Sequence, residues 1–133
     1  MTTTHYLDTS VAVRVLLGHS PSAATWFDRT TRSDDRVVSS RLLVTELTRV
    51  LRREGLPVAR RAEIVDHLDL IGVDHAVLQE AEAIVPHIRT LDAIHLASAL
   101  RSGLPDLTVV THDQTMASVA EQIGFAVLDP VQE

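Results

Sequence analysis

The chain has 133 residues, of which 45% are apolar and 23% charged, so it fits one globular domain rather than a disordered segment. It contains no cysteine, which excludes a disulfide framework and a thiolate metal site. A net charge of −6 argues against general wrapping of nucleic acid. We see no signal peptide and no apolar stretch long enough to span a membrane, so we expect a cytoplasmic protein.

Short apolar strands alternate with helices along the whole chain. Strands are expected at residues 4–7, 36–39, 71–73, 107–111 and 125–128, and helices at 10–17, 20–30, 40–54, 58–68, 74–86, 90–100 and 113–124. This alternation is typical of a parallel sheet covered by helices on both faces. We find no repeat or linker, so the sequence predicts a single α/β domain over residues 1–133, with three α/β/α layers and a mostly parallel central sheet.

Two aspartates stand where predicted strands end. Asp8 directly follows the first strand, and Asp113 comes two residues after the strand at 107–111. In an open parallel sheet, ligands bind outside the carboxyl ends of the strands, so both positions suit a functional site. Each aspartate also precedes a predicted helix, where it could simply serve as the N-cap. Either residue alone leaves both interpretations open.

Glu46 lies in the middle of the helix predicted at 40–54. It is four residues from Leu42 and three from Leu43, so it borders the apolar stripe of that helix. A charge in such a place is costly unless it is paired or binds a metal. The sequence therefore predicts either a metal ligand or a salt bridge, for example to Arg49.

The helix predicted at 90–100 is apolar almost all the way round, with Thr90 as its expected N-cap. Its polar exceptions, Asp92, His95 and Ser98, recur every three residues and form one narrow stripe. The stripe is either the only solvated face of the helix, with Asp92 favoured by the helix dipole, or the lining of a polar pocket in which Asp92 is a ligand.

Taken together, these acids suggest a cation site. If Asp8, Glu46, Asp92 and Asp113 converge, their mutual repulsion favours binding of protons or of a cation. Ligands that offer only oxygen select hard ions, so magnesium or manganese is expected rather than zinc. Such a cluster suits hydrolysis of a phosphodiester by metal-activated water. The seven histidines show no metal-ligand spacing among themselves, so His95 and His112 are expected at most to support metal ligands from outside.

Four segments carry a specific resemblance. They are Tyr-Leu-Asp-Thr-Ser at 6–10, Ser-Arg-Leu-Leu-Val-Thr-Glu-Leu at 40–47, Leu-Asp-Ala-Ile-His-Leu-Ala-Ser-Ala at 91–99 and Val-Val-Thr-His-Asp-Gln-Thr-Met-Ala at 109–117. In this order, over nearly the whole chain, they resemble the PIN-domain ribonucleases, and most closely the VapC-type toxins of type II toxin–antitoxin systems. Met116 stands where leucine is common, a departure that should affect only packing.

The resemblance implies a PIN-like fold and a magnesium-dependent endoribonuclease. It implies that the four acids form the metal-binding site, with Asp8 and Asp92 as direct ligands and with hydroxyls of Ser10 and Thr111 nearby. It also implies an RNA substrate, a homodimer and a cognate VapB-type antitoxin. We expect the C-terminal segment of that antitoxin to place an arginine among the acids.

The basic residues are unevenly distributed. All twelve are arginine, and six of them lie between residues 41 and 61. They form either solvated helix faces or a surface that binds phosphate, which the bidentate guanidinium suits. In the second interpretation, Arg49, Arg52 and Arg53 provide a basic rim for RNA beside Glu46.

Three other functions are compatible with parts of this pattern. A receiver-type phosphoacceptor domain has similar architecture and an acidic pocket, but it requires a lysine, and this chain has none. An inactive PIN-like binding module is disfavoured because all four acids are present. A PIN nuclease for RNA maturation differs from a toxin mainly in its substrate and genetic setting.

Overall fold

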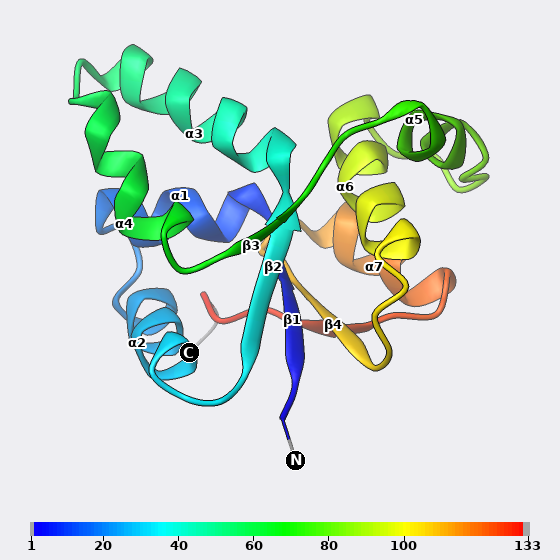
Figure 1. The fold of residues 1–133 in the computed structure, drawn as a ribbon, viewed down its shortest axis with the longest axis horizontal. Helices are drawn as coiled ribbons and strands as arrows, with labels where there is room; N and C mark the ends of the chain where they lie inside the picture. Colours follow the sequence, from blue (N-terminus) through cyan, green and yellow to red (C-terminus); the bar gives the residue numbers. More distant parts are fainter. Residues whose placement is uncertain (1, 132–133) are drawn as a thin grey trace.

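The computed structural model describes residues 2–131 and has a single central sheet (Figure 1). Five strands are arranged in the order β3-β2-β1-β4-β5, and every neighbouring pair is parallel. All carboxyl ends therefore meet at one edge of the sheet. The strands are β1 (Thr4–Leu7), β2 (Arg36–Ser40), β3 (Asp69–Ile71), β4 (Leu107–Val110) and β5 (Ala126–Leu128).

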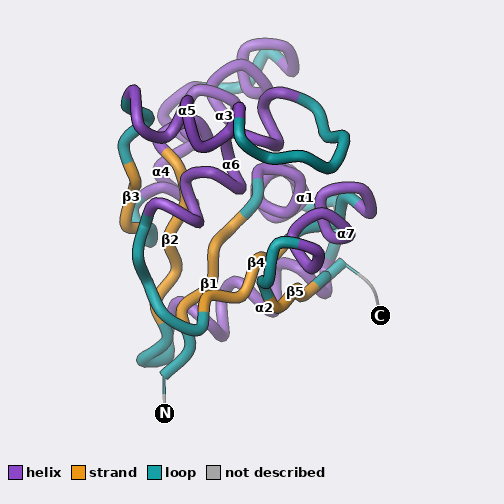
Figure 2. Tube along the Cα trace, turned by 90° about the vertical axis from the view of Figure 1, so that its right-hand side faces the viewer, coloured by secondary structure: helices purple, strands orange, loops and turns teal. Residues whose placement is uncertain are grey.

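Helices cover both faces of this sheet, as Figures 1 and 2 show. One face carries the first four α-helices, and the other carries the last three, with α5 packed on α6. The α/β/α fold predicted from the sequence is therefore confirmed. The helices are α1 (Thr9–Leu17), α2 (Pro21–Thr31), α3 (Arg41–Glu54), the 3₁₀ helix η1 (Val58–Arg61), α4 (Ala62–Val65), α5 (His75–Glu82), α6 (Thr90–Arg101) and α7 (Gln114–Gln122).

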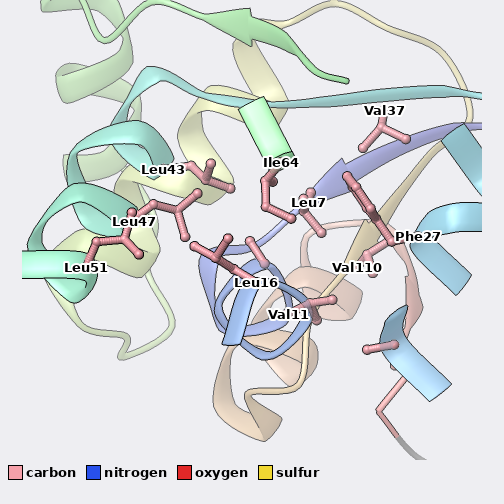
Figure 3. Close-up of a cluster of buried hydrophobic side chains, with 12 residues drawn as sticks. Leu7, Val11, Leu16, Phe27, Val37, Leu43, Leu47, Leu51, Ile64 and Val110 are labelled. Atoms are coloured by element: carbon pink, nitrogen blue, oxygen red, sulfur yellow. The ribbon is translucent and has the colours of Figure 1, made fainter. Parts of the chain in front are cut away.

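Alternation along the strands explains the two apolar cores. Leu7 and Val37 point to one face of the sheet, whereas their neighbours Tyr6 and Val38 point to the other. The first face packs against α3, whose buried leucines recur every four residues and so line one side of the helix (Figure 3). These leucines are Leu43, Leu47 and Leu51.

Two predicted elements were placed incorrectly. The third strand runs from Asp69 to Ile71 rather than over residues 71–73. It is an outermost strand of the sheet and pairs only with β2, so it is partly exposed and lacks a clear apolar pattern. The segment 58–68 forms a 3₁₀ turn and one turn of α-helix rather than a continuous helix. Its one fully buried side chain, Ile64, offers little packing to support a longer helix.

The connections at the carboxyl edge bring the functional segments together. Asp8 joins β1 directly to α1, and Ser40 ends β2 and caps α3 by accepting from the Leu42 amide at 3.1 Å. Thr111 follows β4 and leads to α7. No helix within residues 2–131 is long and apolar enough to cross a membrane.

Candidate active site

Asp8 occupies the N-cap position of α1, but its side chain does not cap the helix. The carboxylate is only 3% exposed as a residue, and its Oδ2 accepts from the hydroxyls of Ser10 at 2.6 Å and Thr111 at 2.8 Å. Capping therefore does not explain this aspartate. The structure places the two hydroxyls identified in the sequence on one oxygen of Asp8, which leaves Oδ1 without a hydrogen bond among the described residues.

Glu46 is paired, although with a histidine rather than an arginine. Its Oε1 accepts from the hydroxyl of Thr9 and from Nε2 of His95, both at 2.7 Å. Burial is the largest influence on its pKa and acts to raise it. The hydrogen bonds from His95 and from the Thr9 hydroxyl outweigh burial, so the pKa of Glu46 is lowered. The alternative of a salt bridge to an arginine is therefore wrong. The two side chains that bond to Oε1 favour the ionised form of Glu46.

Asp92 and Asp113 share one arginine. The guanidinium of Arg89 approaches Asp92 Oδ2 at 3.2 Å through Nε and Asp113 Oδ2 at 3.0 Å through Nη2. Burial, followed by the charge of Asp8, raises the pKa of Asp92, although Arg89 opposes both. Asp113 also caps α7, since its Oδ1 accepts from the Met116 amide at 2.8 Å. For Asp113, the capping interpretation therefore holds, while its other carboxylate oxygen pairs with Arg89.

The polar stripe of α6 faces inward. His95 is 1% exposed and Ser98 is fully buried, so the stripe is not the solvated face of this helix. The exposed positions of α6 include the apolar residues Leu91 and Leu100. The cap was also misassigned, because Arg89 occupies the N-cap position and Thr90 is the first helical residue. The sequence pattern identified the stripe but not the side on which it lies.

The four acids line one cleft of about 300 Å³ at the carboxyl edge of the sheet. They come from four different elements: the end of β1, the middle of α3, the first turn of α6 and the start of α7. Three arginines also line the cleft, namely Arg14, Arg53 and Arg89. An acidic floor with basic residues around it can hold a cation and still attract a polyanion.

Among the arginines predicted to bind RNA, Arg53 lines this cleft. Arg49 and Arg52 lie exposed on the same helix and are not part of the lining. Sequence reasoning missed Arg14 and Arg89. Helical spacing held a signal for both, because each stands one turn from a site residue: Arg14 four residues after Ser10, and Arg89 three residues before Asp92. Such spacing alone does not distinguish them from ordinary surface arginines.

The histidines near the site differ in position. His95 lies beneath Glu46 and bonds to it, so it supports a ligand candidate rather than facing the cleft. His112 donates its backbone amide to Ser10 Oγ at 3.1 Å, while its ring pairs with Asp129 at 3.0 Å. Its side chain is not among the residues that line the cleft.

The donor set of the cleft fits a hard divalent cation. Carboxylate oxygens are the ligands that magnesium prefers, and magnesium commonly binds through one or two carboxylates while keeping several waters. Within residues 2–131, no three His, Asp or Glu side chains converge closely enough to enclose an ion by themselves. The positive charge between Asp92 and Asp113 is supplied by Arg89, which acts as a stand-in cation there. These residues thus suit a partly hydrated ion better than a closed protein cage.

The fold and the cleft define an α/β protein with an acidic site at the carboxyl edge of its sheet. Comparison of the chain with known proteins agrees with this description. The family model of the PIN domain matches residues 5–122. Ribonuclease VapC46 of Mycobacterium tuberculosis is 39% identical over 128 residues, which cover 94% of this chain and 96% of that protein. Ribonuclease VapC35 of the same species is 35% identical over 136 residues, covering 96% and 97%. This chain therefore belongs to the PIN domain family.

A solved structure supports the same fold. The VapBC2 complex of Rickettsia felis, bound to a DNA fragment from its promoter, matches with a TM-score of 0.70. The alignment covers 96% of this chain and 98% of the other at 13% identity, a level at which the likeness shows the fold alone. The resemblance identified in the sequence to VapC-type PIN domains is thus confirmed by sequence relatives and by architecture.

Proposed function

We propose that this protein is a divalent-metal-dependent endoribonuclease that acts as the toxin of a toxin–antitoxin pair. The observation that carries the proposal is the meeting of Asp8, Glu46, Asp92 and Asp113 in one cleft, in a chain whose relatives are named ribonucleases. The preferred ion is Mg²⁺, or Mn²⁺ in its place, because the donors are oxygens. When bound, the ion supplies a water of lowered pKa and neutralises charge on the phosphate.

The chain itself contributes position and charge. Ser10 and Thr111 hold one oxygen of Asp8, and Thr9 with His95 hold one oxygen of Glu46, so these two carboxylates have limited freedom to rotate. On the rim, Arg14 and Arg53 can contact phosphate oxygens and offset the repulsion between RNA and the acids. The role of Arg49 and Arg52 as outer contacts for RNA remains part of the proposal.

We further propose a homodimer and a VapB-type antitoxin as partners. The proposal draws on the VapBC complex among the structural neighbours and on the resemblance to VapC-type toxins. An arginine from the antitoxin suits the acidic cleft, since one guanidinium can satisfy two carboxylates. Arg89 already makes such a bridge within this chain, so an incoming arginine has to displace Arg89 or bind Asp8 and Glu46 instead.

The test is cleavage of structured RNA by the purified protein with Mg²⁺ or Mn²⁺ and with EDTA. We expect cleavage that the chelator stops and that added ion restores. For substitutions of the four acids in the cleft, Asp66→Asn is the matched control and should cleave RNA as the parent does. Asp66 is an exposed acid at the end of α4 and does not line the cleft. Cleavage that continues unchanged in EDTA would exclude the proposed mechanism.

A further inference from the structure

A buried chain of polar side chains lies beneath Glu46. Tyr6 of β1 is fully buried, and its hydroxyl lies 2.7 Å from Nδ1 of His95 in α6. Nε2 of the same ring lies 2.7 Å from Glu46 Oε1 and 3.1 Å from Thr9 Oγ1. Residues from three elements thus meet at one carboxylate oxygen, and a fourth element is connected to it through the His95 ring. The proposed metal site does not by itself explain why the tyrosine and the histidine are there.

The direction of each hydrogen bond follows from the chemistry of the groups. The carboxylate of Glu46 can only accept, so Nε2 of His95 must carry the hydrogen that it donates. A neutral imidazole then has a bare Nδ1, which accepts from the hydroxyl of Tyr6.

Two donors therefore converge on a single oxygen of Glu46. Thr9 and His95 both bond to Oε1 at 2.7 Å, and Oε2 has no hydrogen bond among the described residues. Glu46 lines the cleft, so Oε2 is the oxygen available to an ion or its bound water. Donors on one oxygen restrict rotation of the carboxylate and orient the other oxygen, as outer partners of metal ligands commonly do.

We propose that His95, anchored by Tyr6, is a positioning residue that presents Glu46 Oε2 to the cation site. The inference rests on the proposed function, because orientation of Glu46 matters only if that carboxylate serves an ion. The alternative is that His95 is merely a satisfied polar group within the core. The two differ in what they predict for ion binding by a folded variant.

Three substitutions separate orientation from packing. His95→Leu fills similar volume without a donor, His95→Gln restores an N–H group, and Tyr6→Phe removes only the hydroxyl that sets the tautomer. Leu96→Met is the matched control, because Leu96 is fully buried beside His95 on α6 and packs in the same core as Tyr6. This control changes packing by a volume-conserving swap without touching the polar chain.

The primary measurement is Mn²⁺ affinity of the full chain by titration calorimetry, with folding checked by circular dichroism. We expect His95→Leu to lower the affinity by about 10- to 100-fold, which is typical of losing an outer partner of a metal ligand. His95→Gln should recover most of this loss, Tyr6→Phe should lose a few-fold, and Leu96→Met should match the parent. Activity should fall in kcat, with KM for RNA nearly constant.

A second measurement is independent of ion binding. The ¹⁵N shifts of the His95 ring should show the Nε2–H tautomer in the parent and a mixture in Tyr6→Phe. A parent ring in the Nδ1–H tautomer would overturn the proposal, as would parent-like Mn²⁺ affinity in both a folded His95→Leu variant and Tyr6→Phe. If the parent neither binds Mn²⁺ nor cleaves RNA, the proposed function itself fails, and the role of His95 fails with it.

Discussion

The carboxylates on the two sides of the acidic cleft are held by different kinds of partner. On the inner side, Glu46 bonds to Thr9 and to His95, which is almost completely buried. On the outer side, Asp92 and Asp113 share Arg89, whose side chain is 77% exposed. The pKa values of the two sides also differ in direction. His95 and Thr9 lower the pKa of Glu46 against the effect of burial, whereas burial and the charge of Asp8 raise the pKa of Asp92 against the effect of Arg89.

This difference separates a rigid part of the site from an exchangeable one. Buried donors on short side chains and a ring have few alternative conformations, so the inner carboxylate is preorganised. An exposed arginine pair is screened by water and contributes little to stability, so Arg89 can leave without disturbing the fold. We therefore expect cations to exchange on the outer side, while the inner side determines where one oxygen of Glu46 points.

The largest expected effect comes from the outer acid Asp92. Asp92→Asn should lower RNA cleavage by at least about 100-fold, because it removes charge from the cation site. It should not lower the melting temperature of the metal-free protein, since burial and Asp8 already disfavour the charged form of this side chain. Cleavage rates and thermal melts of the same preparations test both halves of the prediction.

Asp113 provides the matched contrast on the same side of the cleft. Asp113→Ala should also lose activity, but it removes the cap of α7 as well and so should reduce stability by about 1 kcal/mol. Asp92 caps no helix. If Asp92→Asn instead destabilises the metal-free protein as much as Asp113→Ala does, Asp92 serves the fold rather than a cation.

The basic rim gives the next effect. Arg53→Glu should weaken RNA binding and reduce the slope of log affinity against log salt by about one, because Arg53 lines the cleft. Charge reversal at Arg49 or Arg52 should have a smaller effect in the same direction. Binding measured by fluorescence anisotropy at several salt concentrations checks this order, with Mn²⁺ affinity nearly constant in the Arg49 and Arg52 variants, which lie outside the lining of the cleft.

Arg29→Glu serves as the control for these charge reversals. Arg29 is an exposed residue of α2, which lies below α1 in Figure 1, and it does not line the cleft. The Arg29→Glu substitution changes the net charge by the same amount as Arg53→Glu but leaves the lining of the cleft unchanged. Equal weakening by Arg29→Glu and Arg53→Glu would mean that RNA responds only to overall charge.

The positions of most acids in the cleft could be predicted from the sequence. Asp8 and Asp113 were identified by their places after strands, because parallel strands bring their carboxyl ends to one edge. Glu46 was identified by its position beside an apolar stripe. These signals are local, and they depend on the period of a helix or the end of a strand rather than on contacts between distant segments.

The partners of Glu46, Asp92 and Asp113 could not be predicted in the same way. His95 and Glu46 are 49 residues apart, and helical period alone does not tell whether a polar stripe faces water or a neighbouring element. Arg89 is a long, exposed side chain, and its bridge depends on where α7 places Asp113. The edge strand β3 was misplaced for a related reason, since partial exposure weakens its apolar pattern.

A smaller effect tests the exchangeable side directly. Arg89→Gln removes the cation between Asp92 and Asp113, so Mn²⁺ should bind a few-fold more tightly than to the parent. Arg36→Gln is the control, because Arg36 makes an exposed pair with Asp69 outside the cleft. Titration calorimetry measures both variants. Weaker Mn²⁺ binding by Arg89→Gln would show that Arg89 supports the ion rather than competing with it.

The smallest expected effect is the pH dependence of stability in the metal-free protein. The pKa of Glu46 is lower in the folded chain than its ordinary value of 4.5, so its stabilising contribution is present above that value and is lost as pH falls through the folded pKa. The pKa of Asp92 is raised above 3.8, so its contribution is present below that value and is lost as pH rises through the folded pKa.

Glu46→Gln should therefore be less stable than the parent near pH 7, with the gap closing in acid. Asp92→Asn should be at least as stable as the parent near pH 7, with any advantage disappearing in acid. Melting temperatures between pH 3 and pH 7 measure both curves, and curves of the same sign for the two variants would contradict the distinction between the two sides of the cleft.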